Sequence, residues 1–143
     1  MLRFVEEVRT VVDEGGGEEV VPEKVAALLR SLLNEPDVLD PRYTRPKTGN
    51  YVLYPIWVEP GGRFSIASAV WDVGQVTPVH DHGTWGVIGI YRGIEHEVRY
   101  RSQRDGGAIH VYGADIGAIR RHVYDLQTGD VRTFVSGWTA VEA

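Results

Sequence analysis

From Tyr51 onward the apolar residues follow a period of two, and this change of pattern constrains the fold more than any other feature. A strand places successive side chains on opposite faces. In residues 63–72 one face would carry Phe64, Ile66, Ser68 and Val70, and the other Ser65, Ala67, Ala69 and Trp71. Further strand-like runs cover residues 76–80, 85–91, 94–101, 108–112 and 131–135, with glycines and prolines between them. Short strands in quick succession predict an antiparallel β-sandwich or small barrel.

Two segments with helical periodicity precede the strands. The first has apolar residues at helical spacing from Leu2 to Val12 and ends at three consecutive glycines. The second has an apolar stripe from Val25 to Leu33 and follows Pro22, which suits a first helical position. We therefore expect one mainly β domain, with a helical cap over residues 1–36, a surface loop over 37–50 and a β-barrel over 51–143.

Composition limits the classes of function. The 143 residues carry a net charge of −5, which argues against nucleic-acid binding because phosphate contacts need clustered Lys and Arg. The chain has no cysteine, so a metal site would use histidine and carboxylate ligands. Acidic residues interrupt the start of the chain and no apolar run is long enough to span a bilayer. We expect a cytoplasmic protein without membrane partners; its oligomeric state stays open.

The candidate site begins with two histidines separated by one residue. On a strand, this spacing places His80 and His82 on the same face, and Asp81 points away from them. Two neighbouring imidazoles suit iron, nickel, copper or zinc. Gly74 and Gly93 lie on either side of the pair and could form the turns at the ends of a hairpin around it.

This arrangement resembles the first motif of the cupins, in which a glycine, two histidines one residue apart, a glutamate and a closing glycine follow one another. Here Gly86 stands where the glutamate is usual. The resemblance implies the cupin double-stranded β-helix, a small jelly-roll barrel.

Within the cupins, residues 77–89 resemble the thiol dioxygenases, the cysteine dioxygenase family with its bacterial 3-mercaptopropionate-type members. Tyr43-Thr44-Arg45 is similar to the family loop whose arginine binds the substrate carboxylate, and Ile109-His110-Val111-Tyr112 is similar to a strand that lines the iron pocket. Arg121 falls where the 3-mercaptopropionate type places its carboxylate-binding arginine. The resemblance implies an iron-dependent oxidoreductase that uses O2 to convert a small mercapto-carboxylic acid, cysteine or 3-mercaptopropionate, into its sulfinic acid.

The resemblance also implies roles for individual residues. His80 and His82 would bind Fe(II), and Tyr112, held by His110, would act as the catalytic hydroxyl. The carboxylate would be bound by Arg45 in the cysteine type or by Arg121 in the other type.

Two further features depart from the family. The second cupin motif, which normally supplies the third histidine ligand, is absent, and His96 and His122 match no ligand position. The interval from Tyr100 to Ala108 is short where the family has several strands, so an internal stretch is missing relative to the family. Two alternatives therefore stay open: a non-catalytic cupin that binds a small ligand, and a cupin enzyme with another metal. His110 and Tyr112 would then be a hydrogen-bonded core pair.

Overall fold

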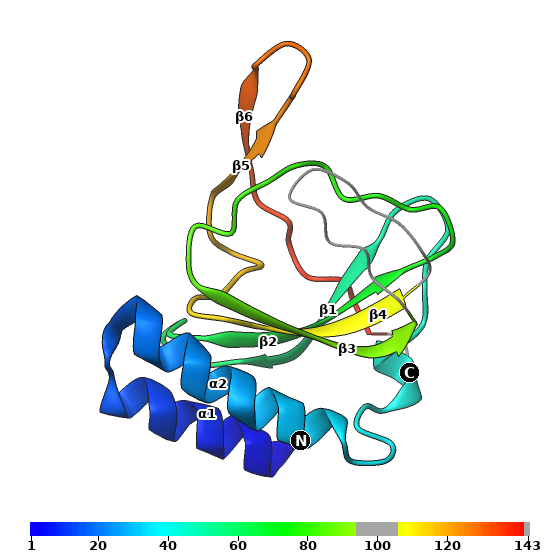
Figure 1. The fold of residues 1–143 in the computed structure, drawn as a ribbon. Coiled ribbons are helices and arrows are strands. Elements are labelled where there is room, and N and C mark those ends of the chain that lie inside the picture. The colour runs from blue at the N-terminus through cyan, green and yellow to red at the C-terminus, as the bar shows by residue number, and fades with distance from the viewer. Residues whose placement is uncertain (94–105, 142–143) are drawn as a thin grey trace.

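The computed structural model describes residues 1–93 and 106–141, and this part contains two helices packed on a mainly antiparallel sheet (Figure 1). The helices are α1 (Leu2–Glu14) and α2 (Gly17–Leu33), followed by the short 3-10 helix η1 (Pro41–Tyr43). The strands are β1 (Val52–Val58), β2 (Ser65–Trp71), β3 (Gly86–Gly93), β4 (Gly106–Tyr112), β5 (Arg121–Tyr124) and β6 (Val131–Phe134).

The strands form a four-stranded sheet in the order β1-β2-β4-β3 and a separate β5–β6 hairpin, and every pair is antiparallel. The expected helical pair and mainly antiparallel β architecture are therefore confirmed. The hairpin projects from the side of the sheet that faces away from the helices (Figure 1). The predicted strand at 94–101 and most of the short interval from Tyr100 to Ala108 lie outside the described residues.

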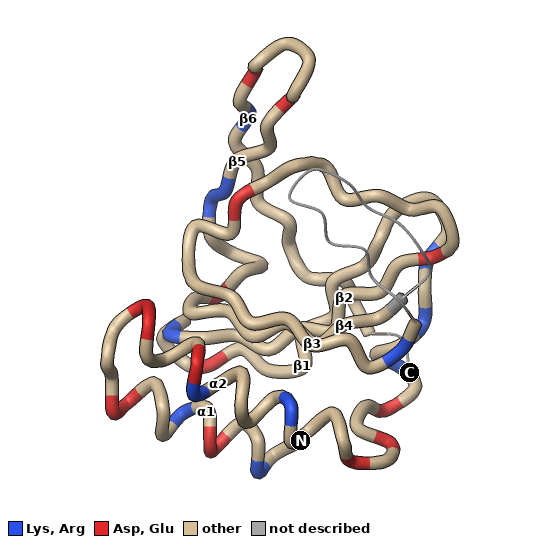
Figure 2. The backbone as a smooth tube through the Cα atoms, viewed as in Figure 1, with Lys and Arg blue, Asp and Glu red and all other residues tan. Residues whose placement is uncertain are grey.

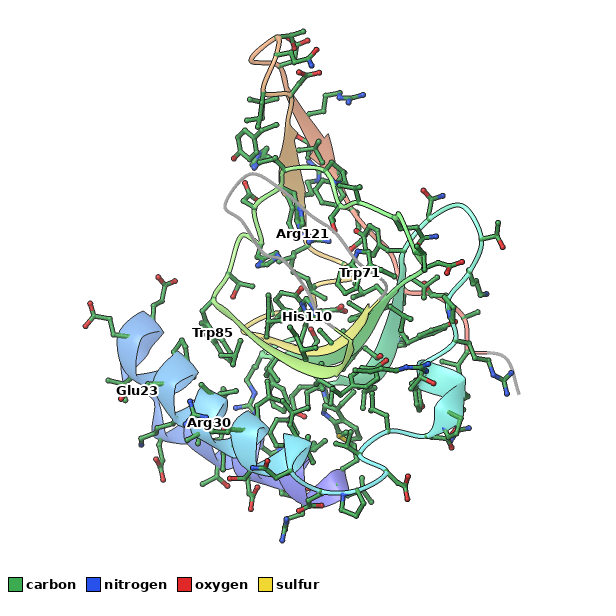
Figure 3. The ribbon with its side chains drawn as sticks, turned by 45° about the vertical axis from the view of Figure 1, so that its right-hand side comes forward. Glu23, Arg30, Trp71, Trp85, His110 and Arg121 are labelled. Atoms are coloured by element: carbon green, nitrogen blue, oxygen red, sulfur yellow. The ribbon has the colours of Figure 1, made fainter. Side chains whose placement is uncertain are left out.

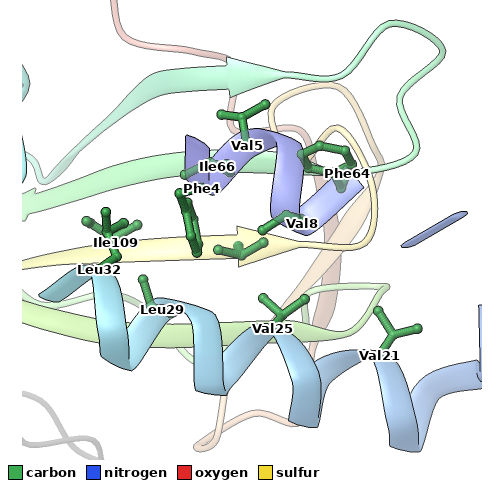
Figure 4. Close-up of a cluster of buried hydrophobic side chains, with 11 residues drawn as sticks. Phe4, Val5, Val8, Val21, Val25, Leu29, Leu32, Phe64, Ile66 and Ile109 are labelled. Atoms are coloured by element: carbon green, nitrogen blue, oxygen red, sulfur yellow. The ribbon is translucent and has the colours of Figure 1, made fainter. Parts of the chain in front are cut away.

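One face of the sheet packs against the helices. Ile66 and Ile109 from the central strands are completely buried among Val25 and Leu29 of α2 and apolar residues of α1 (Figure 4). Burying each aliphatic side chain of this size stabilises the fold by about 2 kcal/mol. At Gly89 of β3, an added Cβ would lie 2.8 Å from a methyl group of Leu29, so only glycine lets α2 approach this strand so closely.

The opposite face carries Ala67 and Ala69 of β2 together with Tyr112 of β4. Because side chains alternate along a strand, His110 shares this face with Tyr112. Cross-strand pairing places Gly86 opposite Tyr112 and Ala67 opposite His110. The two strand residues predicted to be catalytic thus lie on the side of the sheet away from the helices.

Two predictions of secondary structure are wrong, one of a strand and one of the start of a helix. Residues 76–80 form no strand, and their one ladder contact is an isolated bridge between His80 and Val123; Pro78 has no N–H to donate to a sheet. Helix α2 begins at Gly17, so Pro22 lies inside the helix instead of at its first position. Strand β5 was not predicted at all.

Helix α1 is attached to the sheet through a buried carboxylate that follows β1. Glu59 accepts hydrogen bonds from Arg9 Nε and Nη2 at 2.8 and 3.0 Å, from Trp57 Nε1 at 2.8 Å and from Arg63 at 3.1 Å. Many of the other charged residues gather on the outer surfaces of α1 and α2 (Figure 2). In the described part of the chain, neither helix has the combination of length and apolar character needed to cross a bilayer.

Candidate functional site

The two predicted metal ligands lie in a loop, residues 72–85, which connects β2 to β3 and which we call the histidine loop. Their ring centroids are 5.1 Å apart, so the predicted proximity holds although no strand carries it. His80 Nδ1 lies 2.8 Å from the carbonyl oxygen of Pro78. Since a carbonyl only accepts, Nδ1 carries the proton, and Nε2 keeps the lone pair that a metal would use.

His82 packs against Tyr112, with the ring centroids 5.0 Å apart at an interplanar angle of 74°. Burial, reinforced by the nearby charges of His80 and Arg121, lowers the pKa of His82 to about 4. The ring is therefore neutral at physiological pH, and a metal would not have to displace a proton from it.

His110 and Tyr112 share a hydrogen bond of 2.8 Å between Nδ1 and the phenolic oxygen. His110 is only 5% exposed, and its burial, with smaller effects from His82 and His80, lowers its pKa to about 3. Its Nε2 is buried without a hydrogen-bond partner in the described structure. The pair is thus a neutral imidazole that holds a tyrosine hydroxyl beside His82.

Arg121 is the buried cation of this region. Only 2% of the residue is exposed, its guanidinium lies 4.6 Å above the ring of Phe134, and Nη2 donates to the Ser136 hydroxyl. Burial lowers the pKa of Arg121, while Tyr112, Tyr51 and Asp81 act in the opposite direction. Since arginine remains protonated in proteins, this is a positive charge held near the phenol of Tyr112.

Figure 3 shows Arg121, Trp71 and His110 together on the side of the sheet opposite the helices. The Trp71 ring lies 6.0 Å from that of His110 and stacks on Tyr51 at 5.8 Å. The structure therefore brings five segments together: the histidine loop, the end of β2, β4, the start of β5 and the residue preceding β1.

Arg45 lies elsewhere. Its backbone carbonyl accepts a hydrogen bond of 2.8 Å from the hydroxyl of Tyr54, and its side chain is exposed. Tyr54 clusters with Val52 and Val70, and the strand alternation puts these residues on the same face as Ile66, towards the helices. The backbone of Arg45 is thus on the helix side of the sheet, whereas His110 and Tyr112 are on the other side.

Gly86, the first residue of β3, borders the same site. A Cβ at this position would lie 3.2 Å from the Tyr112 ring and 3.5 Å from His82 Nδ1. A side chain here would therefore point at the two residues, and the Tyr112 ring already fills the space that a carboxylate would enter.

An open cavity of about 750 Å³ adjoins His80, between residues 49–51, residues 74–78 and the β5–β6 hairpin. His80, Tyr51 and Phe134 line it. The contributions of Phe134 and Ser136 were not predicted. They depend on contacts between distant segments, and we find no signal for them in the sequence.

The donor set fits iron in part. His80 and His82 offer two neighbouring imidazoles, but within residues 1–93 and 106–141 no group of three or more His, Asp or Glu side chains is arranged around one metal ion. His122 is exposed and contacts Asp81, and His96 lies outside the described residues. When the sequence is compared with known protein families, no family model matches it.

Proposed function

We propose that this chain is a cupin-type, iron-dependent thiol dioxygenase that oxidises a small mercapto-carboxylic acid with O2 to the sulfinic acid. The observation that carries the proposal is the contact set around Tyr112. Its hydroxyl is bonded to buried His110, its ring meets His82 edge-on, and the buried charge of Arg121 lies nearby. A candidate metal ligand, a hydroxyl that can donate a proton and a buried cation thus lie close to one another.

Each side chain has a definite task in this proposal. His80 and His82 would bind Fe(II) through their imidazoles, and the iron would supply the O2 chemistry that no side chain performs. Arg121 binds the substrate carboxylate through its planar array of donors. Tyr112 presents its hydroxyl to the thiolate end of the substrate, and His110 holds that hydroxyl in place. Both atoms of O2 enter the product, so a thiolate RS⁻ becomes RSO2⁻ without an external reductant.

Among the two candidate substrates, the geometry favours 3-mercaptopropionate. Arg121, which marks the 3-mercaptopropionate type, is buried beside Tyr112, whereas Arg45, which marks the cysteine type, has an exposed side chain and a backbone on the helix side of the sheet. A carboxylate bound at Arg121 also compensates a charge that is otherwise costly to bury.

Oxygen uptake tests the proposal. Protein loaded anaerobically with Fe(II) is mixed with 3-mercaptopropionate or cysteine, and O2 consumption is compared with sulfinate formed, measured by mass spectrometry. We expect equimolar consumption and product, faster with 3-mercaptopropionate, and loss of both in His80→Ala together with loss of bound iron. If the protein consumed no oxygen with either thiol, the proposal would be contradicted.

A non-catalytic, ligand-binding cupin is the second candidate. It is favoured by the open cavity of about 750 Å³ next to His80 and by the incomplete metal set in the described residues. On this alternative the purified protein contains no stoichiometric iron and oxidises neither thiol. Metal analysis also distinguishes a cupin that uses zinc or manganese.

A further inference from the structure

We infer that Asp81 is a positioning residue that fixes Arg121 relative to the histidine pair through a carboxylate clamp on β5. The inference rests on the proposed function, because it assigns Arg121 to the substrate carboxylate. Asp81 lies between His80 and His82 in the sequence, and β5 begins with Arg121.

The histidine loop runs alongside β5 and is bonded to it through the backbone. Asp81 N donates to the carbonyl of His122 at 3.1 Å, and Tyr124 N donates to the carbonyl of Val79 at 2.8 Å. An isolated bridge pairs His80 with Val123. Although the loop is not a strand, its backbone is thus bonded to β5 in an antiparallel manner.

The side chain of Asp81 strengthens this contact. Oδ1 accepts from the backbone N–H of His122 at 3.2 Å, while Oδ2 lies 2.9 Å from His122 Nδ1 and accepts from the Tyr124 hydroxyl at 2.8 Å. These bonds, led by that of Tyr124, outweigh the effect of burial and lower the pKa of the Asp81 carboxyl. One carboxylate therefore binds both His122 and Tyr124, the two residues of β5 whose side chains face outward.

Strand alternation divides the contact between loop and β5 into two sides. His122 and Tyr124 face Asp81 on the outer side, where both are exposed. Arg121 is buried on the inner side, close enough to His82 for its charge to lower the pKa of that histidine. The outer clamp and the inner site therefore occupy opposite sides of the same backbone.

The clamp matters because, besides its pairing with β6 and its backbone bonds to the histidine loop, β5 has little other support. It has four residues and pairs as a strand only with β6 in the described part of the chain, and a two-stranded hairpin alone is marginal in water. A mercapto-carboxylate must reach the histidine pair with its sulfur and Arg121 with its carboxylate at the same time. A shift of β5 by about 1 Å is enough to cost a large part of that double contact.

The test measures binding without turnover. Under anaerobic conditions, we titrate the Fe(II)-loaded protein with 3-mercaptopropionate and, separately, the metal-free protein with Fe(II). We expect Asp81→Ala to weaken 3-mercaptopropionate binding about tenfold and to change iron affinity by less than about twofold. Tyr124→Phe, which removes one donor to the clamp, should act in the same direction with a smaller effect.

Asp125→Ala is the matched control. It removes an equal charge from the same hairpin, but the Asp125 carboxylate accepts from the backbone N–H groups of Gln127 and Thr128 within the turn and does not bind the histidine loop in the described structure. It should leave both affinities unchanged. Hydrogen exchange of the metal-free protein, which needs no ligand, should show faster exchange at the Tyr124 amide in Asp81→Ala and unchanged exchange there in Asp125→Ala.

A double-mutant cycle isolates the route through Arg121. If Asp81 acts by placing Arg121, adding Asp81→Ala to Arg121→Gln causes no further loss of 3-mercaptopropionate affinity. Three results would overturn the inference but not the proposed function. They are an equal loss of 3-mercaptopropionate affinity when Asp81→Ala is added to Arg121→Gln, a parallel loss of iron affinity in Asp81→Ala, and unchanged exchange at the Tyr124 amide in Asp81→Ala. Failure of the wild-type iron protein to bind the thiol would overturn the proposed function and the inference with it.

Discussion

Replacing Glu59 by glutamine should weaken the attachment of α1 to the sheet, and the loss should depend on pH. The Glu59 carboxylate is 5% exposed and accepts from Arg9, Trp57 and Arg63. The hydrogen bonds from Arg9 are the largest cause of a pKa lowered from 4.5 to about 2. Glutamine keeps the size and one acceptor oxygen but loses the charge.

The size of the effect follows from this pKa. A shift from 4.5 to about 2, at about 1.4 kcal/mol per unit, corresponds to roughly 3 kcal/mol. Because the arginines partly contact water, which screens the pair, we expect about 1–2 kcal/mol at neutral pH.

The sign follows from linkage. The folded-state pKa of Glu59 lies below the unfolded value, so the charged pair contributes its full stability above about pH 4.5 and loses it as the pH falls towards about 2.

Urea unfolding at steps from about pH 7 down to about pH 3 measures this contribution. The difference in unfolding free energy between wild type and Glu59→Gln should shrink as the pH falls. Glu14→Gln is the matched control, because Glu14 pairs with Lys24 on the surface at 2.7 Å and should cost less than about 0.5 kcal/mol. A difference that is constant with pH, or no larger than that of the control, would refute the assignment.

Three further substitutions test the site and its support. Arg121→Lys keeps a charge but loses the planar donors, so the KM for 3-mercaptopropionate should rise about tenfold, whereas Arg45→Lys should leave it unchanged. Tyr112→Phe removes the hydroxyl bound to His110 and should lower kcat by about 10²-fold, with iron content unchanged by metal analysis. At Gly113 an added Cβ would overlap the indole of Trp85, so Gly113→Ala should destabilise the fold by about 1–3 kcal/mol in urea unfolding.

The sequence predicts the helices and the main sheet well because local periodicity and burial agree there. Val25 and Leu29 lie on the buried face of α2 and Ile66 on that of β2, as their spacing indicates. The start of α2 was predicted wrongly from Pro22, because the helix begins at Gly17 and continues through this residue although it has no N–H to donate. Helix propensity is a weak constraint when a neighbouring apolar stripe packs on a sheet.

Strand β5 could not be predicted from local pattern. It has four residues, of which Val123 is the only aliphatic one, and its position depends on Asp81, 41 residues earlier in the chain. The histidine pair shows the converse. The predicted strand at residues 76–80 does not form, because Pro78 has no N–H to donate to a sheet. The i, i+2 spacing still brings the two rings within 5.1 Å of each other, since the loop runs beside β5 as a strand would.

The burial of Arg121 explains why the proposed ligand is an acid. In the described structure its guanidinium contacts a neutral ring and a neutral hydroxyl, and its Nε has no hydrogen-bond partner. A buried cation without a bound anion destabilises a fold, whereas the same cation binds a carboxylate strongly once one arrives. Neutral His82 and His110 add no charge to that balance. On the proposed function, the carboxylate of a small thiol acid would restore neutrality around Arg121, and its sulfur would then lie towards the histidine pair.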